Sequence, residues 1–159
     1  MNIIRLILTL ISSIIMDILG FFLVPIALIF TREEDDMLPK IFYPWDNYED
    51  TINGDKHWSN LVGKENITKK WYRFKWLALR NPSHNFVKRI IGVKNTGDKY
   101  YFIGDSWEKV STYNGYHKGL YDGKYLQILY HNKWIYIRIG WKYKKEDRYL
   151  RFATIIKRG

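Results

Sequence analysis

The side chains best suited to chemistry gather in one short polar segment, the sequence RNPSHN at residues 80–85. The guanidinium of Arg80 is a planar fork that can bind a phosphate or a carboxylate through two parallel hydrogen bonds. His84 carries an imidazole, the side chain that most often serves as a general acid or base. Arg80 and His84 are therefore the catalytic candidates, and Arg80, Asn81 and Asn85 are the binding candidates in this segment.

The same segment also has a purely structural interpretation. Pro82 ends a helix, because the residue before a proline avoids helical angles. The asparagines then satisfy exposed backbone groups, while Arg80 pairs with carboxylates of the loop at residues 46–55. The sequence offers neither a nucleophile nor a partner base for His84. It therefore favours the structural interpretation and a protein that is not an enzyme.

Acidic residues crowd the next candidate site, a loop in which Asp46, Asp50 and Asp55 are possible ligands of a hard divalent cation. An EF-hand needs glycine at its sixth position, but the sixth residue counted from Asp46 is threonine. Asx turns, with Gly54 at positive φ, explain the same residues. With no cysteine and no zinc-type spacing of its 4 histidines, the sequence predicts no metal and no cofactor.

The charge of the chain is basic and unevenly distributed. The 159 residues carry a net charge of +10, although residues 1–40 hold 3 basic and 5 acidic side chains, a net −2. The rest of the chain therefore carries 23 basic and 11 acidic side chains, a net +12. A folded domain this basic attracts polyanions such as anionic lipid headgroups or nucleic acid.

An apolar segment, Ile3–Phe30, opens the chain, and 21 of its 28 residues are apolar. As one helix it would be about 42 Å long, against about 30 Å of hydrocarbon in a bilayer. Each large apolar residue favours insertion by about 0.3–0.6 kcal/mol, whereas a central aspartate opposes it by about 3 kcal/mol. The apolar sum exceeds the cost of Asp17. We therefore divide the chain into a membrane-associated segment with an acidic exit, residues 1–36, and a basic domain, residues 37–159.

Several conformations of the apolar segment stay open at this level. A spanning helix and a re-entrant hairpin with Asp17 at the headgroups both fit the length and the charge. A pair of buried core helices in a soluble protein is a third alternative, whereas a cleaved signal peptide lacks its small-residue cleavage site. Orientation favours the cytoplasmic leaflet for the basic domain, since anionic lipids attract each Lys or Arg by about 1 kcal/mol.

The elements after residue 60 predict an α+β fold. A helix capped by Asn66 runs to about Leu79, with Trp71 on its apolar face. Residues then alternate with period two, which predicts a mostly antiparallel sheet with one buried face. In the clearest strand, Lys133–Tyr143, isoleucines 135, 137 and 139 share one face and Arg138 the other. The expected strands are Phe86–Lys94, Lys99–Ile103, Trp107–Tyr113, Lys124–Tyr130, Lys133–Tyr143 and Arg148–Ile156.

Two motifs and their order resemble an uncharacterised family of small proteins encoded by tailed bacteriophages. The motifs are WLALRNPSHNF at residues 76–86, of the form RNPxxNF, and RIGWK at residues 138–142. An apolar start, Leu38-Pro39 and Asp46-Asn47 precede them in the same order. The resemblance implies a viral origin and a membrane-linked or virion role, and it supplies no catalytic residues. We add Arg138 and Lys142 to the binding candidates.

The sequence thus leads to three functional hypotheses. In the first, a phage-encoded, membrane-anchored, non-enzymatic protein acts at the inner face of the host membrane, in envelope remodelling or superinfection exclusion. In the second, the chain is a minor virion component that serves assembly or genome ejection. In the third, it is a membrane-bound hydrolase or transferase that acts on a phosphate-bearing lipid or cell-wall precursor through Arg80, His84 and the carboxylates of residues 46–55.

The expected partners follow from the same residues. Basic and aromatic side chains interleave at Lys69–Trp76, a composition that suits bases stacked in a nucleic-acid groove. It equally suits a headgroup layer, where Trp and Tyr lie at the interface and Lys and Arg contact phosphates. Because the chain opens with an apolar segment, we expect anionic membrane lipids rather than nucleic acid, with phage or host membrane proteins as further partners.

Overall fold

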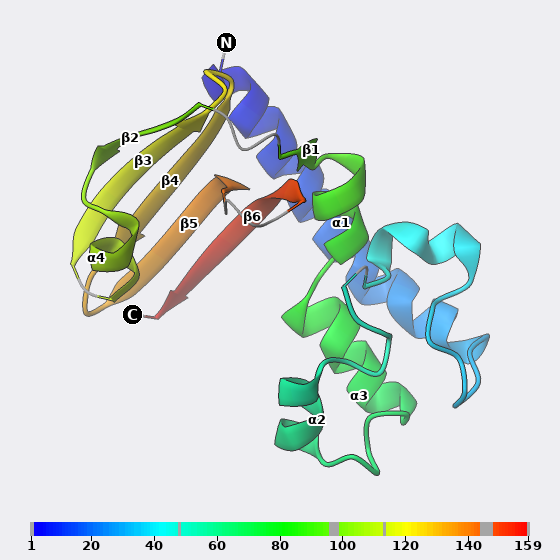
Figure 1. Ribbon diagram of the computed structural model, residues 1–159. Coiled ribbons are helices and arrows are strands. Elements are labelled where there is room, and N and C mark those ends of the chain that lie inside the picture. Colours follow the sequence, from blue (N-terminus) through cyan, green and yellow to red (C-terminus); the bar gives the residue numbers. More distant parts are fainter. Residues whose placement is uncertain (1, 48, 96–98, 113, 144–147, 159) are drawn as a thin grey trace. The chain divides into compact units, whose positions relative to one another are not determined.

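The computed structural model describes residues 2–47, 49–95, 99–112, 114–143 and 148–158 (Figure 1). The chain divides into two compact units. A helical unit comprises residues 14–90, and a sheet unit comprises residues 1–13 with residues 91–159. The fold is α+β, as the sequence predicts. The functional boundary expected after residue 36 is a different division of the chain and stays a prediction.

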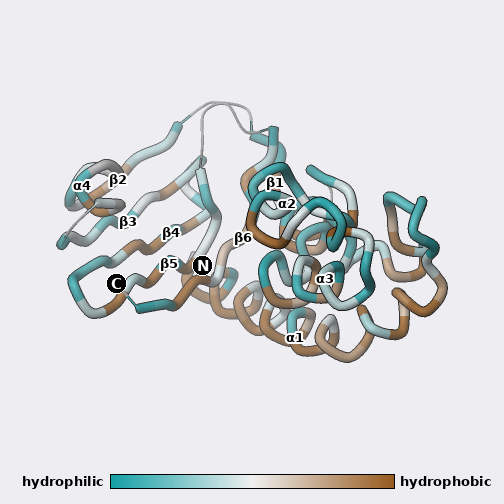
Figure 2. The backbone as a smooth tube through the Cα atoms, turned by 90° about the horizontal axis from the view of Figure 1, so that it is seen from below, coloured by the Kyte–Doolittle hydropathy of each residue, from teal (hydrophilic) through white to brown (hydrophobic). Residues whose placement is uncertain are grey.

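The apolar segment forms one continuous helix, α1 (Asn2–Ile29), which contributes its start to the sheet unit and the remainder to the helical unit. The re-entrant hairpin is therefore not formed. α1 passes through both Asp17 and Gly20, where a hairpin would turn, and Pro25 lies inside it. Figure 2 shows this helix as an almost unbroken apolar stretch of the backbone.

Five short helical segments complete the helical unit. They are η1 (Lys40–Trp45), α2 (Lys56–Val62), α3 (Lys70–Phe74), η2 (Lys75–Arg80) and η3 (Phe86–Ile90). Asp55 caps α2, because its carboxylate accepts the backbone N–H of Trp58 at 2.6 Å. Val24, Ala27 and Leu28 of α1 enter the apolar core of this unit. The other buried members of that core are Leu38, Trp45, Ile52, Trp58, Phe74, Trp76, Leu77 and Ala78.

The predicted helix at residues 66–79 is confirmed over its second part only. It begins at Lys70, because Asn66 uses its side-chain amide to donate to Val62 O at 2.7 Å rather than to cap the next turn. It continues as the π-helix η2 and ends at Arg80, before Asn81 and Pro82, as expected. Trp71 does not lie on the buried face, since 57% of its surface is exposed.

A six-stranded antiparallel sheet forms the other unit, in the order β1-β6-β5-β4-β3-β2 (Figure 1). Four of its strands confirm predicted ones. These are β2 (Tyr100–Gly104), β4 (Tyr125–His131), β5 (Ile135–Lys142) and β6 (Tyr149–Arg158). The remaining two are the short β1 (Val93–Lys94), at the end of the predicted strand Phe86–Lys94, and β3 (Gly115–Tyr121), where the sequence predicts no strand. Gly115 and Gly119 within β3 conceal its alternation.

Two of the predicted strands are wrong. Most of Phe86–Lys94 is helical, and residues 107–112 form α4 (Trp107–Thr112); Tyr113 lies outside the described residues. Ser106 starts α4, because its hydroxyl accepts the backbone N–H of Lys109 and its carbonyl that of Val110. Alternation over six residues does not distinguish a strand from a helix, so the capping serine is the better signal.

The more buried face of β5 is the one that carries Tyr136, Arg138 and Gly140, whereas its isoleucines are only half buried. Val110 of α4 packs against Leu129 and Tyr136 there, so the small helix covers this side of the sheet. Gly140 is required because its φ is 115° and an added Cβ would overlap the backbone of Leu126.

Candidate functional site

The structure brings His84 and the acidic loop together in the helical unit. His84 Nδ1 donates to Asn47 Oδ1 at 2.7 Å, and His84 Nε2 lies 3.7 Å from Glu49 Oε2. The other oxygen of Glu49 pairs with the ammonium of Lys88. Residues from the RNPSHN segment, the loop and η3 therefore form one polar network, in which His84 and Lys88 are buried.

Asp46 is the most deeply buried carboxylate of this network, with 1% of its surface exposed. Its two oxygens accept the backbone N–H groups of Leu38 at 3.2 Å and Asn47 at 2.8 Å. Burial outweighs these two bonds and raises the pKa of Asp46 to about 6. Asn85 joins the network through backbone contacts, since its N–H donates to Asp46 O and its amide to Tyr43 O.

A pocket of about 320 Å³ adjoins the network. Asn47, Glu49, Asp50 and Asn85 line it together with Asp36, Met37, Tyr43 and Thr51, whereas His84 does not. Ser83 is the nearest hydroxyl in sequence, but it donates to Asp17 of α1. Both ring nitrogens of His84 face side chains of the loop, so His84 links the RNPSHN segment to the loop. This geometry supports the structural interpretation of RNPSHN over general acid–base chemistry.

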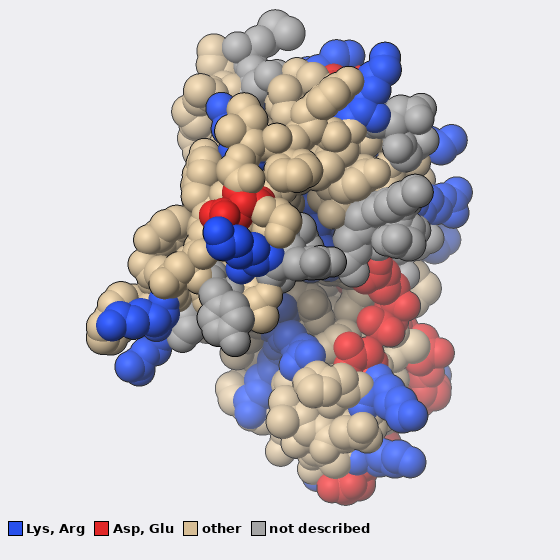
Figure 3. All heavy atoms as spheres, turned by 60° about the vertical axis from the view of Figure 1, so that its left-hand side comes forward, with Lys and Arg blue, Asp and Glu red and all other residues tan. Residues whose placement is uncertain are grey.

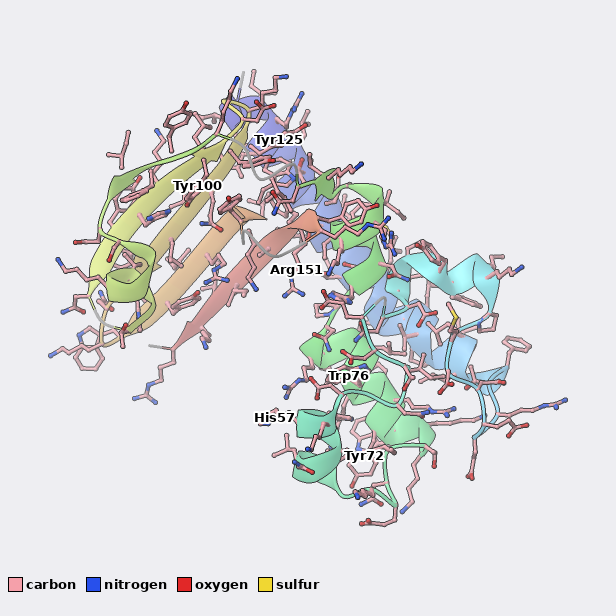
Figure 4. The ribbon with its side chains drawn as sticks, viewed as in Figure 1. His57, Tyr72, Trp76, Tyr100, Tyr125 and Arg151 are labelled. Carbon is pink, nitrogen blue, oxygen red and sulfur yellow. The ribbon has the colours of Figure 1, made fainter. Side chains whose placement is uncertain are left out.

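Arg80 lies apart from this network. Its guanidinium carbon is 5.6 Å from the ring centroid of Trp58 and 5.5 Å from that of Trp76, so it makes cation–π contacts. The expected pairing of Arg80 with the acidic loop is therefore wrong, and His84 and Asn85 tie the loop instead. Asn81 is half buried and caps η2 by donating its backbone N–H to Trp76 O at 3.0 Å. Figure 4 shows Trp76 in the helical unit.

The remaining binding candidates, Arg138 and Lys142, lie on β5 in the sheet unit. Arg138 is 8% exposed, and burial lowers its pKa. Its guanidinium carbon lies 5.7 Å from the ring centroid of Tyr136. Nearby, the ring of Tyr100 (Figure 4) stacks on that of Tyr143 at 4.4 Å, and burial raises the pKa of Tyr100 to about 12. This face is packed with aromatic rings rather than open to an anion.

Two of the three metal candidates, Asp46 and Asp55, bind backbone N–H groups in the structure. Asp46 accepts backbone N–H groups, and Asp55 caps α2. Asp50 lines the pocket, and burial together with the charge of Asp55 raises its pKa. Within the described residues, no group of three or more His, Asp or Glu side chains could hold a metal ion.

The face of α1 that the helical unit covers holds the polar and small residues, and sequence reasoning missed this. Gly20, Val24, Ala27 and Leu28 are buried, and Asp17 is half buried. The spacing of Asp17, Gly20, Val24, Ala27 and Leu28 by three or four residues was the available signal. We call the opposite side of the helix from residue 14 onward the open face. Its exposed large side chains are Ile14, Ile15, Ile18, Leu19, Phe21, Phe22, Ile26, Ile29 and Phe30.

Specific contacts hold the covered face of α1 along its length in the helical unit. Trp45 Nε1 donates to Met16 O at 2.8 Å, and the ring of Trp45 lies against Gly20 so closely that a Cβ there would overlap it. Ser83 donates to Asp17, and Lys70 Nζ lies 3.3 Å from Ile29 O. The polar side of α1 is therefore satisfied by protein, while its apolar side is not covered in the structure.

Arg73 fixes the polar turn that follows α1, and it is a second residue that sequence reasoning missed. Its guanidinium, 1% exposed, donates to Arg32 O and Glu33 O at 2.6 Å, to Asp35 O at 3.2 Å and to Asn53 Oδ1 at 2.7 Å. The sequence does not distinguish Arg73 from the other basic residues around it. Most of its acceptors are backbone carbonyls, which every residue carries, so no residue pattern predicts them.

These features define a class of protein: an α+β protein whose N-terminal helix is long and apolar enough to cross a membrane. Signal sequences and the core helices of some soluble proteins have the same length and composition. Only 17% of the most apolar window of α1 is buried, which is unlike a core helix. A family model matches residues 1–156, and the chain belongs to the family of unknown function DUF7338. No curated protein and no solved structure matches the chain.

Proposed function

We propose that this is a membrane-surface protein whose α1 lies in the plane of the bilayer, with its open face in the acyl boundary and the helical unit above it. One observation carries the proposal. Within the helical unit, the helix turns Asp17 and Gly20 toward the protein and its isoleucines and phenylalanines outward. A water-soluble monomer does not keep so large an apolar face exposed, whereas an interfacial helix requires it.

The contacts along α1 favour this orientation over a spanning helix. Protein covers α1 from Met16, where Trp45 binds, to Ile29, where Lys70 binds, a length of about 20 Å. If α1 stood upright, the covering segments would enter the hydrocarbon with it. They include the buried Asp46 and the exposed Lys70. A charged side chain at that depth costs at least about 2.5–3.5 kcal/mol.

The open face supplies apolar surface on the scale that membrane attachment requires. Each of its nine large side chains is 41–68% exposed. Complete burial of such a side chain is worth about 1.5–3 kcal/mol, so burial of the exposed half contributes about 1 kcal/mol each. The gross gain is on the order of 10 kcal/mol, which is comparable with the entropy lost on association.

The first test is flotation of the purified chain with liposomes, using matched aspartate substitutions. We expect the double variant Ile18→Asp/Ile26→Asp, on the open face, to stay at the bottom of the gradient. Leu61→Asp, at an equally exposed apolar residue of α2, should float like the wild type. Equal flotation of all three proteins would rule out the open face as the attachment surface.

The second test separates an in-plane helix from a spanning one. The chain has no cysteine, so single cysteines can be labelled with a membrane-impermeant maleimide. Arg5→Cys and Arg32→Cys place thiols near the two ends of α1, and Lys56→Cys on α2 reports the side of the helical unit. In-plane binding predicts that all three react from the same side. Protection of one end of α1 until detergent is added would show that the helix spans.

The biological setting is part of the proposal. We place the protein in a phage-infected cell, at the inner face of the host membrane, acting without catalysis in envelope remodelling or superinfection exclusion. The resemblance of RNPxxNF and RIGWK to small phage proteins and the net +12 after residue 40 support this setting. Fractionation of infected cells should recover the chain with inner membranes. Stoichiometric peptides in purified particles would favour the virion hypothesis instead.

A further inference from the structure

An apolar groove of about 570 Å³ runs beside the second half of α1 in the helical unit. Leu28 and Phe74, the most buried of its lining residues, form its floor. Phe21, Pro25, Trp71 and Leu79 form its walls, and Lys70 is the remaining lining residue. The volume falls within the range of about 300–1,000 Å³ that is typical of small-ligand sites.

Aromatic rings that line the groove pack against one another. The rings of Phe21 and Phe74 meet edge to face at 5.6 Å, and Trp71 stacks on Phe74 at 5.5 Å. These contacts join α1 to α3, so the two sides of the groove belong to one packed cluster. Phe21 also belongs to the open face of α1, so the groove is continuous with the surface that we place in the bilayer.

The charge at the groove is positive. Among its lining residues in the described chain, Lys70 is the one with a charged side chain, and it is exposed. A second cation, Lys75, lies beside the wall, with its Nζ 5.0 Å from the ring centroid of Trp71. A site with hydrocarbon walls and ammonium groups at its edge is complementary to an acyl chain that carries an anionic headgroup.

We propose that this groove binds one acyl chain of an anionic phospholipid, such as phosphatidylglycerol, with its phosphate at Lys70. The inference rests on the proposed membrane attachment and adds a lipid class to it. The open face attaches the protein through apolar area alone, which any bilayer satisfies. The groove adds selectivity, because its cations favour an anionic headgroup over a zwitterionic one of the same chain length.

Native mass spectrometry of the full chain in detergent tests the groove without requiring a bilayer. The probes are phosphatidylglycerol and phosphatidylcholine with identical acyl chains. We expect one phosphatidylglycerol to remain bound, and phosphatidylcholine to bind at least severalfold more weakly. Lys70→Glu should weaken phosphatidylglycerol binding more than fivefold, because loss of one surface cation alone is worth about fivefold and the substitution also adds an anion, and it should leave phosphatidylcholine binding unchanged. Lys64→Glu, at an exposed lysine outside the groove, is the charge control.

A filling variant tests the groove volume. Leu79→Trp enlarges an exposed wall residue and should abolish retention of the lipid, whereas Leu61→Trp on α2 should not. Both variants should still float with liposomes, so a failed groove is distinguishable from failed membrane attachment. Lipid retention by Leu79→Trp, equal binding of the two lipids, or a dimer that disappears with Leu79→Trp would each overturn the proposal. The last result would assign the groove to a second copy of the chain.

Discussion

At the scale of single residues, His84 shows how a chemically attractive side chain can be structural. Its ring lies between Asn47 and Glu49, and Glu49 is held by Lys88. We expect His84→Ala to lower the unfolding temperature, because it leaves buried polar groups of the loop without a partner at a cost of about 1–3 kcal/mol. His84→Gln should recover part of this loss, since its amide can still donate to Asn47. Glutamine cannot take up and release a proton as histidine does, so it would not restore the function of a general acid or base. Recovery of in vivo function by His84→Gln therefore indicates the structural role of His84.

Asp46 gives the fold a pH dependence of known sign. Its pKa is about 6 in the folded chain and about 3.9 when unfolded, so the folded state binds the proton more tightly. The contribution of Asp46 to stability is therefore greatest below about pH 4 and falls as pH rises through about 6. Because the decline lies between these two pKa values, melting temperatures measured from pH 4 to 7 should show it in the wild type and level off above about pH 6. The decline should be smaller in Asp46→Asn, and an identical slope in both would contradict the assignment.

At the scale of elements, Gly20 shows why α1 contains a glycine near its centre. Glycine costs about 1 kcal/mol relative to alanine in a helix, but here it gives room to the ring of Trp45. Gly20→Ala should therefore destabilise the chain by about 1–3 kcal/mol despite the gain in helix propensity. Leu19→Ala, on the open face, is the matched control and should change the melting temperature little. A more stable Gly20→Ala would show that Trp45 does not pack there.

Patterns of side chains predicted most of the strands but not the covered face of α1. The strands β2, β4, β5 and β6 follow period two, and the burial of one sheet face enforces that period. Phe86–Ile90 has the same pattern, but Lys88 pairs with Glu49 from a helical turn, a tertiary contact that no local pattern encodes. The sequence also identified both clusters of the polar network, the RNPSHN segment and the acidic loop. It did not predict which side chains pair between them, because those pairs depend on tertiary contacts.

At the scale of the whole molecule, the basic side chains do not all share one surface. On the face drawn in Figure 3, the lysines and arginines of the described residues are interspersed with acidic and uncharged side chains. A site that tracks a nucleic-acid backbone needs a continuous basic track, because its affinity comes from neighbouring phosphates. The apolar face of α1 and the cationic edge of its groove instead combine the two attractions that anionic membranes offer.

If the outward side chains of α1 serve only the membrane, the protein should fold without them. The variant Ile15→Glu/Leu19→Lys/Phe22→Glu/Ile26→Lys replaces four open-face residues and creates two favourable Glu–Lys pairs at i, i+4. We expect it to be a soluble monomer with the circular dichroism spectrum of the wild type and a cooperative melt, but unable to float with liposomes. Ala27→Lys/Leu28→Glu, on the covered face, should unfold because it places two charges in the core of the helical unit. Aggregation of the first variant without detergent would mean that α1 needs lipid to fold, as a spanning helix does.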